Sequence, residues 1–195
     1  MPPEKYRFNR FSHSVLLGAL CDFGCDSEDL ISPFSATVLG PLCSAAVQRD
    51  WVCAMDHCWA RKKFPPQLVP DSAYHQQDWH QDGALGVTFP AQAGEVLPMT
   101  ELLTCWIPLT PCGENSPGLE FVRRPVRNLL HFTELDDAAL RRRFASHEFC
   151  APVLAPGDAL VFLNGTLHRT YARPDMQYPR LSAEYRVFPR TSARL

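Results

Sequence analysis

The sequence has no apolar run long enough to cross a membrane and no strong charge of either sign. Its 195 residues carry 19 lysines and arginines against 21 aspartates and glutamates, which gives a formal net charge of −2. A membrane-spanning helix needs roughly 18 or more consecutive apolar residues, and no stretch approaches that length. A chain so close to neutral gives no electrostatic reason to bind nucleic acid or an acidic surface. The sequence therefore predicts neither a membrane nor a nucleic-acid partner.

The eight cysteines form no regular framework. The chain is long enough to build an ordinary core, so it does not need the disulfides of small secreted domains. The pairs Cys21/Cys25 and Cys53/Cys58 have spacings that match no common structural zinc site. An apolar stretch at 15–21 follows basic residues, but it is at the lower length limit of a signal peptide and no small-x-small cleavage pattern follows it. We therefore expect reduced, buried thiols in a cytoplasmic protein.

No internal repeat, low-complexity tract or linker divides the chain, so we expect one domain over 1–195. Residues 1–67 are predicted to be mainly helical support. Within them, apolar residues of Ser44–Lys62 recur at helical spacing, which predicts an amphipathic helix that ends before Pro65.

Residues 68–190 have the texture of short strands joined by turns. Prolines are frequent at 18, and many lie in short turn-like segments between apolar stretches. Helices first and then many short antiparallel strands predict an α+β fold. Its core is a double-stranded β-helix, which is a jelly-roll (cupin-like) arrangement, and the N-terminal helices pack outside the sheet.

The segment Trp79–Gly83 offers a histidine and an aspartate two residues apart. On an extended strand such residues point to the same face, so His80 and Asp82 can reach one point. One imidazole nitrogen and one carboxylate oxygen are two of the three ligands of the facial triad that holds non-haem Fe(II). A second histidine, distant in sequence, has to complete the triad. We predict His168, which comes after the turn at Asn164 and Gly165.

Arg180 and Ser182 come next, again two residues apart on a predicted strand. A guanidinium with a hydroxyl beside it on the same face is a good receptor for a buried carboxylate. Taken singly, each has an ordinary explanation, since His168 could be a core histidine and Arg180 could form a surface salt bridge. The order of all these groups along one chain favours a shared site.

This order resembles that of the Fe(II)/2-oxoglutarate dioxygenases, and most of all the phytanoyl-CoA dioxygenase-like family. The resemblance covers roughly residues 68–190. It rests on His80-x-Asp82, Gly118-Leu119-Glu120-Phe121-Val122, Pro156-Gly157-Asp158-Ala159-Leu160-Val161-Phe162, His168 and Arg180-x-Ser182. Two departures bear on the substrate. The Pro-Gly-Ser-His that usually comes after the glycine–leucine segment is replaced by Arg123-Arg124-Pro125, and the chain is short for the family.

The resemblance implies three iron ligands, which are His80, Asp82 and His168. It also implies that Arg180, helped by Ser182, binds the distal carboxylate of 2-oxoglutarate, and that Thr104 offers a hydroxyl to this cosubstrate. The expected cofactors are Fe(II), 2-oxoglutarate and O2, and the expected partner is a small organic substrate that becomes hydroxylated while succinate and CO2 are released. Relatives that halogenate lack the carboxylate ligand, so Asp82 favours hydroxylation.

Two other functions are compatible with a jelly roll. The first is a non-catalytic metal- or ligand-binding protein with a vestigial site, which would have no need of a buried receptor for a carboxylate. The second is a cupin-type metalloenzyme without a cosubstrate, which usually has three or four His/Glu ligands, and no His-x-His occurs in this sequence. The sequence does not identify the substrate or the oligomeric state. The loop at 90–101 and the segment 123–132 are expected to cover the mouth of the barrel.

Overall fold

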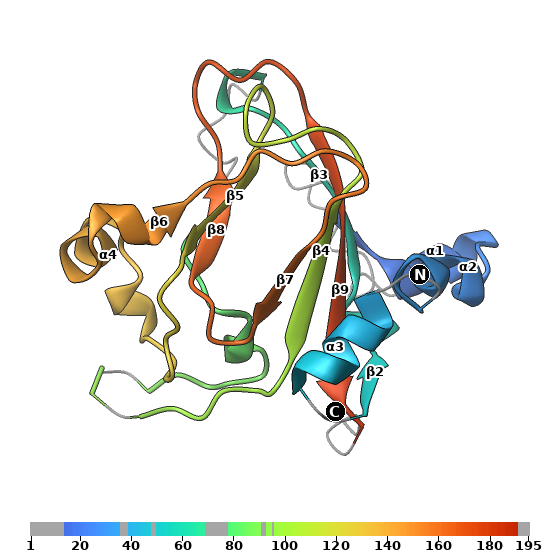
Figure 1. Cartoon of the computed structure of the whole chain (residues 1–195), viewed down its shortest axis with the longest axis horizontal. Helices are drawn as coiled ribbons and strands as arrows, with labels where there is room; N and C mark the ends of the chain where they lie inside the picture. The colour runs from blue at the N-terminus through green and yellow to red at the C-terminus, as the bar shows by residue number, and fades with distance from the viewer. Residues whose placement is uncertain are drawn as a thin grey trace.

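The computed structural model describes residues 14–35, 39–47, 50–68, 78–90, 93–94 and 96–190. The strands among them are β1 (Ser14–Leu16), β2 (Trp51–Cys53), β3 (Trp59–Lys63), β4 (Leu103–Pro108), β5 (Gly118–Val122), β6 (Phe149–Cys150), β7 (Leu160–Leu163), β8 (His168–Tyr171) and β9 (Arg180–Pro189). They form two sheets that face each other, as Figure 1 shows. The larger sheet has the order β1–β3–β9–β4–β7, with β2 also paired to β9, and the smaller has the order β6–β5–β8. All of these strand pairs are antiparallel.

The helices lie outside this pair of sheets. They are α1 (Leu17–Leu20), α2 (Ser27–Ser35), α3 (Leu39–Val47) and α4 (Asp137–Arg143), with short 3₁₀ turns at Cys21–Phe23, Met55–His57, Pro66–Leu68, Asp82–Ala84, Phe132–Glu134 and Ser146–Glu148. Figure 1 shows α1, α2 and α3 on the outer side of the larger sheet and α4 beside β6. The predicted α+β jelly roll with external N-terminal helices is confirmed. The single domain over 1–195 stays a prediction.

The long strand β9 organises the larger sheet, because it pairs with β2, β3 and β4. Successive side chains of a strand point to opposite faces. Ala183, Tyr185 and Val187 therefore face outward, where they pack with Leu17 of α1 and Cys43 of α3 in one apolar cluster. The alternate residues of β9 face the interior between the sheets. They are Arg180, Ser182, Glu184 and Arg186, and all four are buried. The interior of this barrel is thus polar on one wall.

The predicted helix at Ser44–Lys62 is wrong. The helix α3 ends at Val47, and β2 and β3 lie on either side of a short turn at 54–58. Both strands pair with β9, so they complete the larger sheet. The apolar residues of 51–63 match a helical spacing, but in the structure these segments pair with β9, so tertiary pairing overrides the local pattern. No glycine or proline marks the turn.

Candidate metal centre

Two backbone hydrogen bonds bring His80 and His168 together, although they lie 88 positions apart. The His80 N–H donates to the His168 carbonyl at 3.0 Å, and the His168 N–H donates to the His80 carbonyl at 3.1 Å. This bridge adds residue 80 to the free edge of β8 in the smaller sheet. The two imidazole rings lie side by side with their centroids 4.1 Å apart. Gln81 is extended, and a 3₁₀ turn begins at Asp82, so the chain carries the aspartate back toward both rings.

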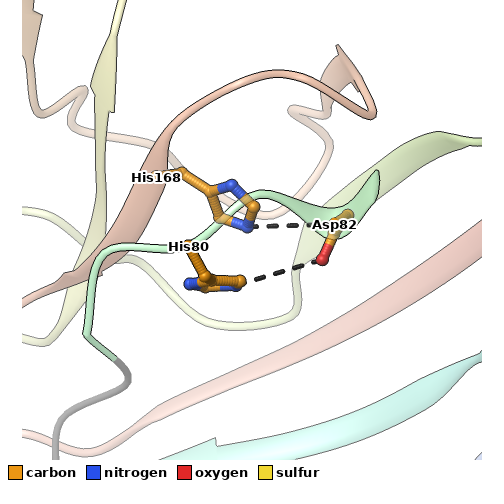
Figure 2. Close-up of side chains that lie close together, drawn as sticks. All are labelled: His80, Asp82 and His168. Atoms are coloured by element: carbon orange, nitrogen blue, oxygen red, sulfur yellow. Dashed lines mark ion pairs between the residues drawn. The ribbon is translucent and has the colours of Figure 1, made fainter. Parts of the chain in front are cut away.

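His80, Asp82 and His168 converge on one point, as Figure 2 shows. His80 Nε2 lies 3.9 Å from Asp82 Oδ1, and His168 Nε2 lies 4.0 Å from Asp82 Oδ2. One ligand atom from each residue lies within 4.8 Å of the other two. Metal–ligand bonds of about 2.0–2.2 Å place ligand atoms roughly 3–4 Å from one another, so this spacing suits a single ion. The sequence prediction that these three side chains meet is confirmed.

Hydrogen bonds fix the ring nitrogen that each histidine turns to this point. His80 Nδ1 lies 2.7 Å from the Asp78 carbonyl oxygen, and His168 Nδ1 lies 3.0 Å from the Thr166 carbonyl oxygen. A carbonyl only accepts, so each Nδ1 carries the hydrogen and each Nε2 presents a lone pair. Burial, together with the neighbouring His168, lowers the pKa of His80 to about 4, which keeps its imidazole neutral near pH 7. Two neutral imidazoles and one carboxylate are the donor set of non-haem Fe(II) sites.

Two further side chains hold the Asp82 carboxylate in place. Thr104 on β4 donates its hydroxyl to Asp82 Oδ2 at 2.6 Å, and Arg186 Nη2 donates to Asp82 Oδ1 at 2.8 Å. Burial alone would raise the pKa of Asp82, but the charge of Arg186, with the neighbouring histidines and the Thr104 hydrogen bond, lowers it below its ordinary value. The carboxylate is therefore ionised and oriented before any ion binds. The predicted role of the Thr104 hydroxyl toward a cosubstrate stays a prediction, since in this structure that hydroxyl contacts Asp82.

Arg186 is the functional residue that the sequence reasoning missed. Its Nη2 lies 2.6 Å from Glu184 Oε1, and Glu184 Oε2 accepts from Arg61 Nε of β3 at 2.9 Å. A continuous row of alternating charges thus runs from the metal centre across β9 to β3. The signal was present in the alternation of Arg180, Ser182, Glu184 and Arg186, which places all four on one face of the strand.

Arg180 and Ser182 lie on the same interior face of β9 as Arg186. Both are 1% exposed. Arg180 stacks its guanidinium 4.9 Å from the centre of the Trp106 ring and donates Nη1 to the Gly118 carbonyl at 3.1 Å. The Ser182 hydroxyl is buried without a hydrogen-bond partner among the described residues. Lys63 pairs with Arg180 across the β3–β9 register and is also buried.

Within the described ranges, the interior wall formed by β3 and β9 carries four cationic side chains. The cations are Arg61, Lys63, Arg180 and Arg186, and the carboxylates that face them are Asp82 and Glu184. Burial first, and then the charges of Arg61 and Arg180, lower the pKa of Lys63 to about 8. The Ser182 hydroxyl lies on this wall with no hydrogen-bond partner in the part of the chain that the structure describes, so it can donate to a bound anion.

A mainly apolar cavity of about 550 Å³ is lined by two aromatic rings that neighbour His168, although none of the three converging side chains lines it. Phe121 and Phe162 line it, and their ring centroids lie 6.0 and 4.7 Å from that of His168. Met99 and the segment 125–127 form another part of its wall. The two segments that were expected to cover the barrel mouth therefore both contribute to this cavity.

None of the helices in the described part of the chain has the length and apolar character that a bilayer crossing demands. No protein-family model matches the sequence, and no curated protein matches it either. Solved structures do match. The structure of EctD from S. alaskensis with 2-oxoglutarate and 5-hydroxyectoine superposes with a TM-score of 0.67 at 15% identity, over 92% of this chain and 57% of that one. The same enzyme with bound Fe gives a TM-score of 0.64 at 14% identity, over 92% and 58% of the two chains.

A third match is the epimerase SnoN in complex with Fe³⁺, alpha ketoglutarate and nogalamycin RO. Its TM-score is 0.56 at 16% identity, over 92% of this chain and 64% of that one. This chain thus spans about three-fifths of the length of the solved structures that it matches. At these identities the likeness shows the fold. The chain has the double-stranded β-helix fold of these iron- and 2-oxoglutarate-binding proteins, with a His–Asp–His triad inside it.

Proposed function

We propose that this protein is a non-haem Fe(II)- and 2-oxoglutarate-dependent oxygenase that hydroxylates a small organic substrate and releases succinate and CO2. The observation that carries the proposal is the convergence of His80 Nε2, His168 Nε2 and the Asp82 carboxylate within 4.8 Å, with both Nδ1 atoms held by carbonyls. Three protein ligands on one side of an ion leave three positions for other ligands. Bound iron and 2-oxoglutarate would supply the oxidising power, because decarboxylation of the cosubstrate provides two of the electrons that O2 requires.

Each residue of the proposed site has a definite task. His80, Asp82 and His168 hold the iron, and the negative charge of Asp82 offsets part of the charge of the ion. Thr104 and Arg186 keep the Asp82 carboxylate in a fixed orientation. Arg180 and Ser182 bind the distal carboxylate of 2-oxoglutarate, which is supported by their burial on the positively charged interior wall. A bidentate guanidinium–carboxylate pair would orient the cosubstrate with little loss of rotamer freedom.

The substrate is proposed to place an apolar part in the cavity beside Phe121 and Phe162, because both rings lie against a proposed iron ligand. The presence of Asp82 favours hydroxylation over halogenation. The cytoplasmic location is also part of the proposal, and it rests on the cysteine pattern of the sequence. The competing function is a jelly-roll binding protein with a vestigial metal site.

Binding of 2-oxoglutarate separates these two functions. We expect the Fe(II)-loaded protein to bind 2-oxoglutarate in anaerobic calorimetry, and Arg180→Ala to weaken that binding by about thirtyfold or more, or ~2 kcal/mol, while iron binding persists. Asp82→Ala and His168→Ala should lose iron binding and succinate formation. Arg142→Ala is the matched control, because Arg142 is exposed on α4. Iron binding without 2-oxoglutarate binding in the wild type would refute the oxygenase and favour the vestigial site.

A further inference from the structure

Two cysteines face each other at the turn between β2 and β3, outside the metal centre. Cys53 ends β2, and Cys58 directly precedes β3. Their sulfur atoms lie 3.5 Å apart, although neither is bonded to the other. A disulfide requires about 2.05 Å between sulfurs, so the pair has to close by only about 1.5 Å, which a side-chain rotation can supply. The spacing of the pair fits no structural zinc site, and the proposed oxygenase chemistry does not use either thiol.

The turn that joins these cysteines is held by its own hydrogen bonds. The His57 N–H donates to the Ala54 carbonyl at 2.9 Å, and the Cys58 N–H donates to the Met55 carbonyl at 3.1 Å. The Ala54 N–H donates to the Arg186 carbonyl of β9 at 3.1 Å, which anchors the turn to the sheet. The two thiols are therefore presented to each other by a fixed backbone, and bond formation between them closes only a short loop.

The two thiols differ in access and in acidity. Cys53 is partly exposed, whereas Cys58 is 0% exposed. The hydrogen bond between the thiols lowers the pKa of Cys53, and the same contact together with burial raises the pKa of Cys58. An oxidant from solution thus meets Cys53 first, in the form that is more readily a thiolate, with a protonated thiol waiting behind it.

We propose that Cys53 and Cys58 are a peroxide-oxidised pair that forms a reversible intramolecular disulfide. The Cys53 thiolate attacks one oxygen of a hydroperoxide, the O–O bond breaks, and the leaving oxygen takes a proton to give water or an alcohol. The resulting sulfenic acid is attacked by the Cys58 sulfur, whose proton leaves with the displaced hydroxyl as water. In sum the two thiols lose two electrons and two protons, and the peroxide is reduced.

The disulfide has a structural route to the metal centre. Cys58 Sγ accepts the backbone N–H of Arg186 at 3.3 Å, and the guanidinium of the same residue donates to Asp82. Movement of the Cys58 sulfur toward Cys53 alters the hydrogen bond that this sulfur accepts from the backbone N–H of Arg186. Mutation of a group that orients a metal ligand typically lowers metal affinity by about 10–100-fold. We therefore expect the oxidised protein to bind metal about tenfold more weakly than the reduced protein. This coupling rests on the proposed metal site, whereas the disulfide itself does not.

Peptide mapping of the full-length protein tests the bond. The protein is loaded with redox-inert Zn²⁺, treated with hydrogen peroxide, denatured and alkylated. Trypsin places both cysteines on the single peptide 50–61. We expect this peptide to be two hydrogens lighter and unalkylated after oxidation, and doubly alkylated once dithiothreitol is added. Recovery of the doubly alkylated peptide after oxidation, or a cross-link from Cys53 to Cys43, would overturn the proposal.

Variants assign the order of the two steps. In Cys58→Ser, Cys53 should stop at the sulfenic acid, which dimedone traps, and in Cys53→Ser the buried Cys58 should stay reduced at the same dose. Cys25→Ser is the control and should form the disulfide as the wild type does, because Cys25 is exposed and distant in sequence from the pair. Zn²⁺ titration of the oxidised and reduced wild type then tests the coupling, and equal affinities would overturn it without touching the peptide result.

Discussion

Replacement of Arg186 by methionine tests how the carboxylate of Asp82, a proposed metal ligand, is held in place. The guanidinium contacts Asp82 at 2.8 Å and Glu184 at 2.6 Å, and the side chains of all three residues are at most 10% exposed. Methionine keeps much of the volume and removes the charge, so two buried carboxylates lose a cationic partner at once. Removal of one member of a buried ion pair costs about 3–5 kcal/mol of unfolding free energy, and we expect Arg186→Met to fall in that range at pH 7.

The loss of unfolding free energy caused by Arg186→Met should depend on pH in a defined direction. Arg186 helps to hold the pKa of Asp82 below its usual value. A carboxyl group with a lowered folded-state pKa contributes stability that is complete above its unfolded pKa of about 4 and is lost as the pH falls toward the folded value. Without Arg186 this contribution to stability is smaller. The difference in unfolding free energy between wild type and Arg186→Met should therefore be largest near neutral pH and should become smaller below about pH 4. Metal binding should also weaken, because a proton then competes for Asp82.

Urea unfolding at several pH values, in the presence of a chelator, measures the unfolding free energy of each protein. Titration with Zn²⁺ or Fe(II) measures its metal affinity. Arg186→Lys keeps the charge but cannot contact both carboxylates through a planar fork, so it should recover only part of the loss. Arg142→Met on exposed α4 controls for loss of an arginine as such. This role of Arg186 would be refuted if the unfolding free energy of Arg186→Met lay within about 1 kcal/mol of the wild-type value and its metal affinity were unchanged at all pH values.

Three further changes test other parts of the site. The pKa of Lys63 is lowered to about 8, so the interior loses a positive charge above that pH. Calorimetry should therefore show weaker 2-oxoglutarate binding at pH 9 than at pH 7. Lys63→Met should abolish this difference between the two pH values. Thr104→Val removes the hydroxyl that donates to Asp82, which should cost about 1–3 kcal/mol of stability in urea and should reduce metal affinity. Gly165→Ala places a methyl group against the Val126 carbonyl oxygen, and thermal unfolding should show a loss of about 1–3 kcal/mol, since neither backbone can easily yield. A wild-type-like result in any of the three would contradict the contact on which it rests.

The sequence predicted the jelly-roll part of the fold better than the N-terminal part, for a physical reason. In the later strands the turns are marked by residues such as Asn164 and Gly165, so strand limits can be located. Around β2 and β3 the signals disagree. β2 and β3 are only three and five residues long, so neither strand is long enough to establish a clear alternation, and no glycine or proline marks the turn between them. The period of two disappears, and the remaining apolar spacing fits a helix.

His80 and Asp82 could be predicted from their local spacing and His168 from its place in the order of motifs along the chain, whereas the contact of Arg186 with Asp82 could not. Asp82 and Arg186 are 104 positions apart, and nothing in either local sequence indicates that they meet. The sequence analysis linked only Arg180 and Ser182 of the β9 alternation to the site. Glu184 and Arg186 gave no further signal of burial, since polar alternation usually faces water.

In the structure that polar face of β9 is buried between the sheets, opposite an apolar cluster on the outer side. A barrel whose interior wall holds Arg180, Ser182, Glu184 and Arg186 is costly to fold unless those groups serve a polar ligand inside. Among the described residues, Asp82 contacts Arg186, and Glu184 contacts Arg61 and Arg186. The buried Ser182 hydroxyl has no hydrogen-bond partner in the ranges that the structure describes, so an anion that accepts from it should stabilise the folded protein. We therefore expect a gain in stability from 2-oxoglutarate even when no metal is present. Ligand-dependent unfolding in a chelator tests this, and the absence of any shift at millimolar 2-oxoglutarate would refute an anion-binding role for the interior wall.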